Sequence, residues 1–96
     1  MDLTFEWDPR KDRANLEKHR ISFSEAMAVF DDPLARIFVD EDHSADERRE
    51  IIVGHSQAKR LLLVCFTEPD QGRVRIISAR RATRRERHDY EEYLRH

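Results

Sequence analysis

The chain has 96 residues, 40% of them charged, and a formal net charge of −2 at pH 7. This length predicts one domain over residues 1–96. The net charge excludes the broadly basic surface of a dedicated nucleic-acid binder, so any contact with RNA or DNA must be made by a local basic patch. The single cysteine, Cys65, excludes an internal disulfide, and the longest apolar run, Leu61 to Phe66, is too short to cross a membrane. We therefore expect a cytoplasmic protein without membrane contact.

The first third of the chain predicts one strand and two helices. Apolar and polar residues alternate from Leu3 to Trp7, which is typical of a strand. An Asp-Pro pair follows and predicts the start of a helix over Pro9–His19. Ser22 and Glu25 have the spacing of a capping box, which predicts a second helix that ends at Asp31–Pro33.

The rest of the chain predicts a short strand, an acidic loop, a meander of three strands and a last helix. Short turns between consecutive strands indicate antiparallel neighbours. The predicted fold class is α+β, an antiparallel sheet with helices packed on one face. The expected elements are the strand Leu34–Val39, the loop Asp40–Glu50, the strands Ile51–His55, Arg60–Thr67 and Gly72–Ala79, and a helix that begins near Thr83 and docks through Tyr90 and Leu94.

Arginine is concentrated near the C-terminus: residues 73–90 hold seven arginines, one glutamate and one aspartate. The planar guanidinium group suits bidentate contact with phosphate. Strict alternation along the last strand places Val74, Ile76 and Ser78 on one face, and Arg73, Arg75, Ile77 and Ala79 on the other. The strand and the turn after it are thus predicted to form a phosphate-binding edge. The alternative is a solvated helix face whose charge is balanced by the acidic half of the chain.

Three segments resemble the BrnT toxins of type II toxin–antitoxin systems, in that family's order and spacing. They are FEWDPRKDRANLEKHRISFSEAMAVF, ERREIIVGHSQAKRLLLVCFTE and RVRIISARRATRRERHDYEEY, which cover nearly all of the chain. The resemblance implies a RelE-like fold and a metal-independent endoribonuclease, without a cofactor, that inhibits translation. Many RelE-like toxins are clearly basic, so the charge of −2 favours a narrow RNA site, or one that the ribosome helps to supply.

The resemblance also implies partners. A cognate, BrnA-like antitoxin is expected to neutralise the toxin and to bring it to operator DNA, and RNA is expected as the substrate, free or as ribosome-associated mRNA. A different function fits the same residues: a non-catalytic protein-binding module that acts with a DNA-binding partner in operon autoregulation. A basic antitoxin would meet the acidic segment Asp40–Glu50, whereas a partner that uses the sheet edge would meet the arginines.

Cleavage of RNA without a metal needs a base for the ribose 2′-OH, cations for the pentacovalent phosphate and an acid for the leaving 5′-oxygen. The resemblance makes Arg75, Arg80 and Arg49 the candidate phosphate clamp, because these arginines fall on positions of the family's motifs. Further candidates for binding RNA are Arg73, Arg81, Arg84 and Tyr90, although packing is the favoured role for Tyr90.

Candidates for proton transfer are His19, Lys18 and Glu47. Lys18 and His19 lie three and four residues after Asn15 and share a helix face with it. An imidazole is suited because its charge changes near neutral pH. The structural alternative is that His19 stabilises the C-terminus of its helix. His43 lies among acidic residues, but the spacing is no recognised ligand pattern, so no metal site is expected.

Overall fold

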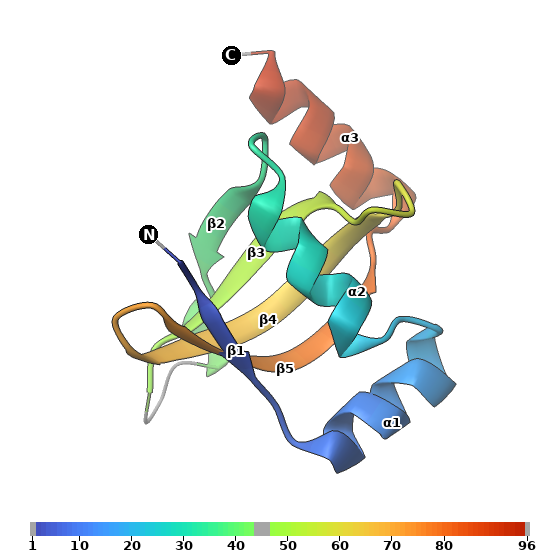
Figure 1. Ribbon diagram of the computed structural model, residues 1–96. Helices are drawn as coiled ribbons and strands as arrows, with labels where there is room; N and C mark the ends of the chain where they lie inside the picture. Colours follow the sequence, from blue (N-terminus) through green and yellow to red (C-terminus); the bar gives the residue numbers. More distant parts are fainter. Residues whose placement is uncertain (1, 44–46, 96) are drawn as a thin grey trace.

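The computed structural model describes residues 2–43 and 47–95. Within them the chain forms an α+β fold with a five-stranded sheet in the order β1-β5-β4-β3-β2 (Figure 1). The strands are β1 (Thr4–Glu6), β2 (Arg36–Val39), β3 (Arg49–His55), β4 (Leu61–Asp70) and β5 (Arg73–Arg81). The helices are α1 (Pro9–His19), α2 (Phe23–Met27) and α3 (Arg84–Leu94), with 3-10 turns η1 (Ala28–Asp31) and η2 (Glu41–His43).

The predicted antiparallel meander is confirmed for β2 to β5, but the sheet as a whole is mixed. The N-terminal strand β1 lies beside the last strand, β5, and pairs with it in parallel over Thr4–Glu6 and Arg73–Arg75. The prediction of a purely antiparallel sheet is therefore wrong. A parallel pair needs a long crossover, and here that crossover is most of the chain, so no local turn signals it.

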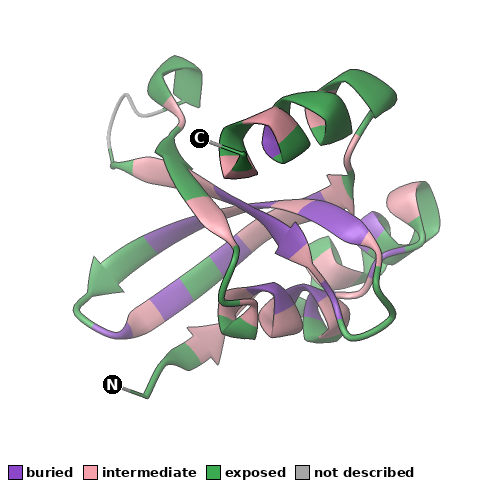
Figure 2. Cartoon of the chain, turned by 90° about the horizontal axis from the view of Figure 1, so that it is seen from above, coloured by how far each residue is buried: buried purple, intermediate pink, exposed green. Residues whose placement is uncertain are grey.

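The helices lie on both faces of the sheet, and the prediction that they pack on one face is also wrong (Figure 2). One face, the α2 face, buries Phe23 of α2 against Ile52 and Val64. On the opposite face, the α3 face, Tyr90 of α3 packs with Val53. The reason is that β3 and β4 are apolar at consecutive positions, so that both faces of these strands need cover. None of the helices in the described ranges is long and apolar enough to cross a membrane.

The helix starts follow the sequence signals closely. Asp8 Oδ1 accepts a hydrogen bond from the Arg10 amide at 2.8 Å, which caps α1. Ser22 Oγ accepts from the Glu25 amide at 3.0 Å, but the Glu25 carboxylate binds Arg60 and Ser56, so this capping box is only half formed. The box of α3 is complete, with reciprocal bonds between Thr83 and Glu86.

The predicted loop Asp40–Glu50 is partly structured. It contains η2, and the first two residues of β3 come from its end. Residues 44–46, which include Asp46, lie outside the described part of the chain.

A buried side chain ties α1 to the sheet. Asn15, 7% exposed, accepts a hydrogen bond through Oδ1 from the Ala79 amide at 3.0 Å. Its Nδ2 donates to the carbonyls of Ala79 at 2.8 Å and Ile21 at 2.9 Å. Since β1 covers only the first part of β5, Asn15 satisfies backbone groups on the outer edge that no strand reaches.

Asn15→Ala is expected to lower the free energy of unfolding by about 3 kcal/mol, because it leaves buried backbone groups of Ala79 and Ile21 without partners. Urea denaturation followed by circular dichroism measures the change. Leu16→Ala, at an exposed neighbouring position, is the matched control and should cost less than about 1 kcal/mol. Equal losses in the two variants would contradict this role for Asn15.

Candidate functional site

A β-bulge in β5 decides which side chains share a face. Cys65 of β4 pairs with Ser78, but the next residue, Phe66, pairs with Ile76, so Ile77 is an extra residue in β5. Bulges of this kind re-aim the side chains that follow them. Ser78 therefore lies on the α3 face, whereas the sequence placed it with Val74 and Ile76.

The same bulge corrects the position of Ala79. This residue is 1% exposed and belongs to the core of the α2 face, although strict alternation placed it with the arginines. Arg80 follows on the α3 face, paired with Leu63. As a result Arg75, Ser78 and Arg80 follow one another along the same face of β5.

Two candidate arginines lie in one row across the sheet. Arg49 of β3 pairs with Thr67 of β4, Thr67 pairs with Arg75 of β5, and Arg75 pairs with Glu6 of β1. Directly paired residues point to the same face, so these four side chains form what we call the arginine row. Thr67 is 2% exposed, and its hydroxyl has no hydrogen-bond partner within residues 2–43 and 47–95.

Carboxylates already hold two arginines of this strand. Glu6 accepts from Arg75 Nε at 2.7 Å and from Arg73 Nη1 at 2.9 Å. The hydrogen bonds from Arg75 and then Arg73 lower the pKa of Glu6 below its usual range. Arg73 is further bound to Asp70. The terminal nitrogens of Arg75 meet no acceptor among the described residues, so Arg75 retains donors for an anion.

Arg80 is held by the helix that follows β5. Its Nη1 and Nη2 donate to the two carboxylate oxygens of Glu86, each at 2.8 Å. The bonds from Arg80, with a further one from the Thr83 amide, lower the pKa of Glu86 to about 2. Arg75 is thus turned towards β1 and Arg80 towards α3. They are five positions apart in a strand, so their Cα atoms are about 15 Å apart, and the structure does not gather them around one point.

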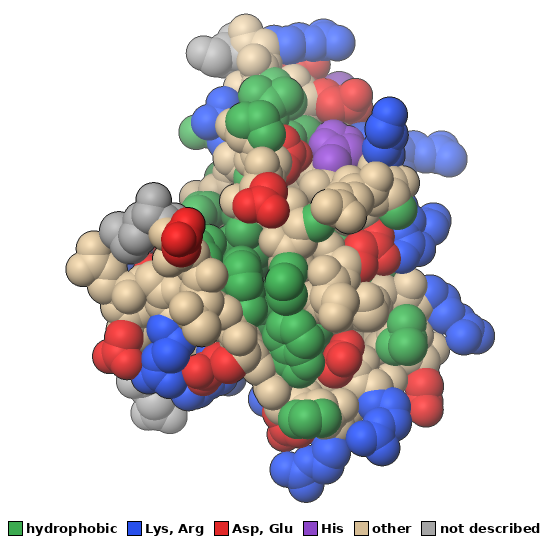
Figure 3. All heavy atoms as spheres, viewed as in Figure 1, with side chains coloured by type: hydrophobic (Ala, Val, Ile, Leu, Met, Phe, Trp, Pro, Cys, Tyr) green, Lys and Arg blue, Asp and Glu red, His purple; other side chains and the backbone are tan. Residues whose placement is uncertain are grey.

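The proton-transfer candidates on α1 border the same strand. Lys18 and His19 line an open groove of about 330 Å³ together with Lys11 and Ser78. We call this hollow between α1 and β5 the α1 groove. Lys and Arg side chains project from the margin of the molecule where α1 lies (Figure 3). The groove adjoins β5 at Ser78, between Arg75 and Arg80.

Sequence reasoning missed Lys11, Thr67 and Glu6. A signal for Lys11 was present, because residues 11, 14, 15 and 18 follow the spacing of one helix face. No local signal exists for Thr67 or Glu6, whose positions depend on the pairing of distant strands.

The remaining candidates are not brought to the groove by any described contact. Glu47 is exposed and lies next to the residues that are not described, and Arg81 and Arg84 are exposed at the end of β5 and the start of α3. Tyr90 is 6% exposed and donates its hydroxyl to the Leu34 carbonyl at 3.1 Å, which gives it a packing role. Contact of these residues with RNA stays a prediction.

His43 and Cys65 have ordinary surroundings. His43 Nδ1 lies 3.1 Å from Asp40, and no group of three His, Cys, Asp or Glu side chains in the described chain is placed to hold a metal ion. Cys65 is half-buried and pairs with Ser78 across the sheet.

Comparison with known proteins decides the family. A model described as "Ribonuclease toxin, BrnT, of type II toxin-antitoxin system" matches residues 7–86. The chain belongs to the BrnT family. The resemblance noted in the sequence is therefore confirmed, and with it membership among the ribonuclease toxins of type II toxin–antitoxin systems.

The fold agrees with a solved member of the BrnT family. The crystal structure of the Brucella abortus ribonuclease toxin BrnT matches with a TM-score of 0.66 and 23% identity, over 85% of this chain and 99% of that chain. No curated protein matches the chain. The α+β class is thus supported, while a RelE-like relationship stays an expectation.

Glu86→Gln keeps the side-chain acceptor of the capping box but removes the charge that pairs with Arg80. Because the folded-state pKa of Glu86 lies below the ordinary 4.5, its stabilisation is fully present above that pH and is lost as the pH falls towards about 2. We expect Glu86→Gln to lower the free energy of unfolding by about 1–2 kcal/mol at neutral pH, a value reduced for partial solvent exposure. The difference from the parent should shrink as the pH falls from 4.5 towards about 2.

Urea denaturation of the parent and of Glu86→Gln at several pH values measures this difference. Glu91→Gln, an exposed position on the same helix, serves as the control and should follow the parent throughout. A deficit that stays constant from neutral to strongly acidic pH would show that the Arg80–Glu86 pair is not its source.

Proposed function

We propose that this BrnT-family toxin is a metal-independent endoribonuclease that inhibits translation and is neutralised by a cognate antitoxin. One observation carries the proposal: Ser78, which lines the α1 groove together with Lys18 and His19, lies between Arg75 and Arg80 on the same face of β5. Arginines that can hold a phosphate thereby flank the strand position that borders an imidazole and an ammonium group that can move protons. The proposed RNA site is confined to these few residues of β5 and α1, in keeping with a chain of net charge −2.

Arg75 is the principal phosphate ligand in this proposal. It is 44% exposed, and only its Nε is engaged, by Glu6, so the terminal nitrogens can form a bidentate bond to a phosphate. Arg49, two strands away in the same row, approaches that phosphate from the other side of Thr67. Arg80 lies too far along β5 to share this phosphate and binds the next part of the RNA backbone.

The α1 groove supplies the proton transfers. His19 takes the proton of the ribose 2′-OH while the 2′-oxygen forms a bond to phosphorus. The bond from phosphorus to the 5′-oxygen breaks, and Lys18 gives a proton to that oxygen, leaving a cyclic phosphate and a 5′-hydroxyl. The groove favours these two residues over Glu47, the third candidate, because both line it beside Ser78.

The substrate and partners follow from this activity. RNA is bound free or as ribosome-associated mRNA in the cytoplasm, and operator DNA is reached only through the antitoxin. A second function, a non-catalytic module in operon autoregulation, is favoured by the ion pairs of Arg73, Arg75 and Arg80 with carboxylates. Such pairs are what a purely structural face would also contain.

Growth and cleavage tests separate these functions. Expression of the chain alone should arrest bacterial growth, and the purified protein should cleave RNA in the presence of a chelator. Arg75→Ala should reduce the cleavage rate by about 10²–10³, as expected when one well-placed donor is lost. Arg80→Ala should also lose toxicity, with some loss of stability.

Arg95→Ala, at the exposed position that caps the C-terminus of α3, is the matched control and should remain as toxic as the parent. Circular dichroism verifies that each variant is folded. Normal growth with soluble, folded parent protein would overturn the enzyme proposal, and undiminished toxicity of both Arg75→Ala and Arg80→Ala would refute the site.

His19→Gln keeps the size and polarity of the side chain but removes its titratable ring. We expect a loss of cleavage of about 10²–10⁴, together with loss of the limb of the pH–rate profile on which the base must be neutral. The control His55→Gln, at a position outside the groove, should leave the profile unchanged. A His19→Gln profile of parental shape would assign the base to another residue.

A further inference from the structure

The edge strand β2 carries an unusual amount of exposed apolar surface. Seven large apolar side chains are exposed in the described residues, and five of them lie on β2, just before it, or opposite it on α3. These are Leu34, Ile37, Phe38, Val39 and Tyr93. We call this set the β2 surface. Natural edge strands are commonly protected by charges, prolines or bulges, and β2 has only one charged residue, Arg36.

The backbone of β2 is also open on its outer side. The Asp40 amide donates to the Arg49 carbonyl at 2.8 Å, which marks one hydrogen-bonded pair between β2 and β3. Hydrogen-bonded pairs alternate along an antiparallel ladder, so Phe38 is the next. The amide and carbonyl groups of Ile37 and Val39 therefore point away from β3, to the side where the described sheet ends.

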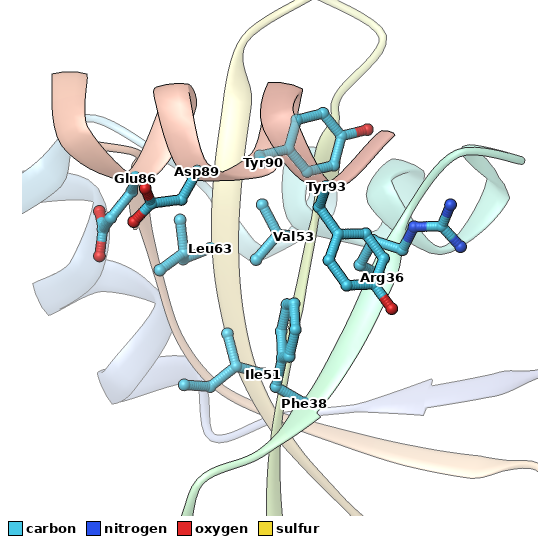
Figure 4. Close-up of a pocket in the computed structure, with 9 residues that line it drawn as sticks. All are labelled: Arg36, Phe38, Ile51, Val53, Leu63, Glu86, Asp89, Tyr90 and Tyr93. Carbon is cyan, nitrogen blue, oxygen red and sulfur yellow. The ribbon is translucent and has the colours of Figure 1, made fainter. Parts of the chain in front are cut away.

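A pocket adjoins this edge on the α3 face (Figure 4). It has a volume of about 240 Å³ between α3 and the sheet, with apolar side chains such as Ile51 and Leu63 along it. The rings of Phe38 and Tyr93 pack edge to face with centroids 6.2 Å apart. The Arg36 guanidinium lies 4.9 Å from the centre of the Tyr93 ring. Glu86 and Asp89 lie at the opposite end from Arg36. The pocket fits one large apolar side chain.

We propose that the antitoxin docks on the β2 surface by adding a strand to β2, with an apolar side chain in this pocket and Lys or Arg residues beside it. This inference rests on the proposed function, which supplies the partner. The charge of the surroundings supports it, because Glu86 and Asp89 lie in the pocket, and Asp40, Glu41 and Asp42 follow β2 directly. Strand addition of this kind uses the free backbone for affinity and pockets for specificity.

Other occupants explain less of the surface. A nucleobase in the pocket would account for Phe38 and Tyr93, but Ile37 and Val39 lie on the opposite face of β2, paired with Ile52 and Glu50. The acidic groups would also repel the RNA backbone. A second copy of this chain, paired antiparallel through β2, would bring Asp40 and Asp42 of one copy towards Asp31 and Asp32 of the other. An added strand from a basic partner covers both faces without that repulsion.

Two variants test the proposal without touching the candidate RNA site. Ile37→Arg places a cation on the exposed side of β2, where it would meet a basic partner. Val39→Pro removes an outward amide and leaves the bonds to β3 in place. Leu16→Arg, an equally exposed leucine on α1, is the matched control. The probe is the tagged product of the small reading frame adjoining the toxin gene, tested by co-purification and by calorimetry with each folded variant.

Ile37→Arg and Val39→Pro are each expected to weaken antitoxin binding by at least about tenfold, the loss typical of a central contact in an interface. The rate of RNA cleavage should be unchanged in both variants. In cells, both should stay toxic without rescue by the antitoxin, whereas Leu16→Arg should be rescued. If the parent neither arrests growth nor cleaves RNA, the proposed function fails, but co-purification still tests the docking surface.

Parental antitoxin binding by both variants would overturn the proposal, as would a parent protein that does not bind the product of the adjoining frame. Loss of RNA cleavage with intact antitoxin binding would assign the β2 edge to RNA. A dimer of the toxin alone that Ile37→Arg dissociates, detected by light scattering, would assign the surface to a second copy.

Discussion

The amide side chain of Asn15 is the contact on which the geometry of the candidate site depends. It satisfies the amide and carbonyl of Ala79 on the outer edge of β5 and also holds the Ile21 carbonyl, where the chain turns from α1 to α2. Buried backbone groups without partners are costly, so α1 is fixed at this distance from the strand. The α1 groove, whose lining includes His19 and Ser78, exists because α1 is held there.

The second organising feature is the pairing of arginines with carboxylates. Glu6 and Glu86 reach the arginines of β5 from β1 and α3, elements that neighbour β5 in space. In these pairs, carboxylates of β1 and α3 balance part of the charge of an arginine-rich strand, in a chain whose net charge is −2. What distinguishes Arg75 is that its pairing uses only Nε. In the proposed function, specificity for RNA depends on which guanidinium donors remain free, more than on the number of arginines.

Local features were predictable from the sequence, and features created by distant pairing were not. The Asp8–Pro9 start of α1, the Thr83–Glu86 box of α3 and the meander from β2 to β5 all have short-range signals, and the structure confirms them. The parallel place of β1, and therefore Glu6 beside Arg75, depends on contacts across nearly the whole chain.

The bulge at Ile77 shows the limit of pattern reasoning within a single strand. A period of two along β5 is correct up to Ile76 and then shifts, because one residue leaves the ladder with β4. That single residue moves Ser78 to the face of Arg75 and sends Ala79 into the core, where its backbone meets Asn15. The bulge makes the prediction of strict alternation wrong. The same bulge aligns the polar side chains of β5 along one face and brings Ser78 to the α1 groove.

The helix α3 connects the two ends of this arrangement. Glu86, in its first turn, holds Arg80 on the β5 side, and Tyr93, in its last, packs against Phe38 on the β2 side. Tyr90 between them is anchored to Leu34 just before β2. Because Glu86 also lines the pocket beside β2, a Lys or Arg residue of a partner beside that pocket would compete with Arg80 for the same carboxylate. A partner bound at one edge of the sheet can thereby change the electrostatics of the other edge through one short helix, without covering the candidate RNA site.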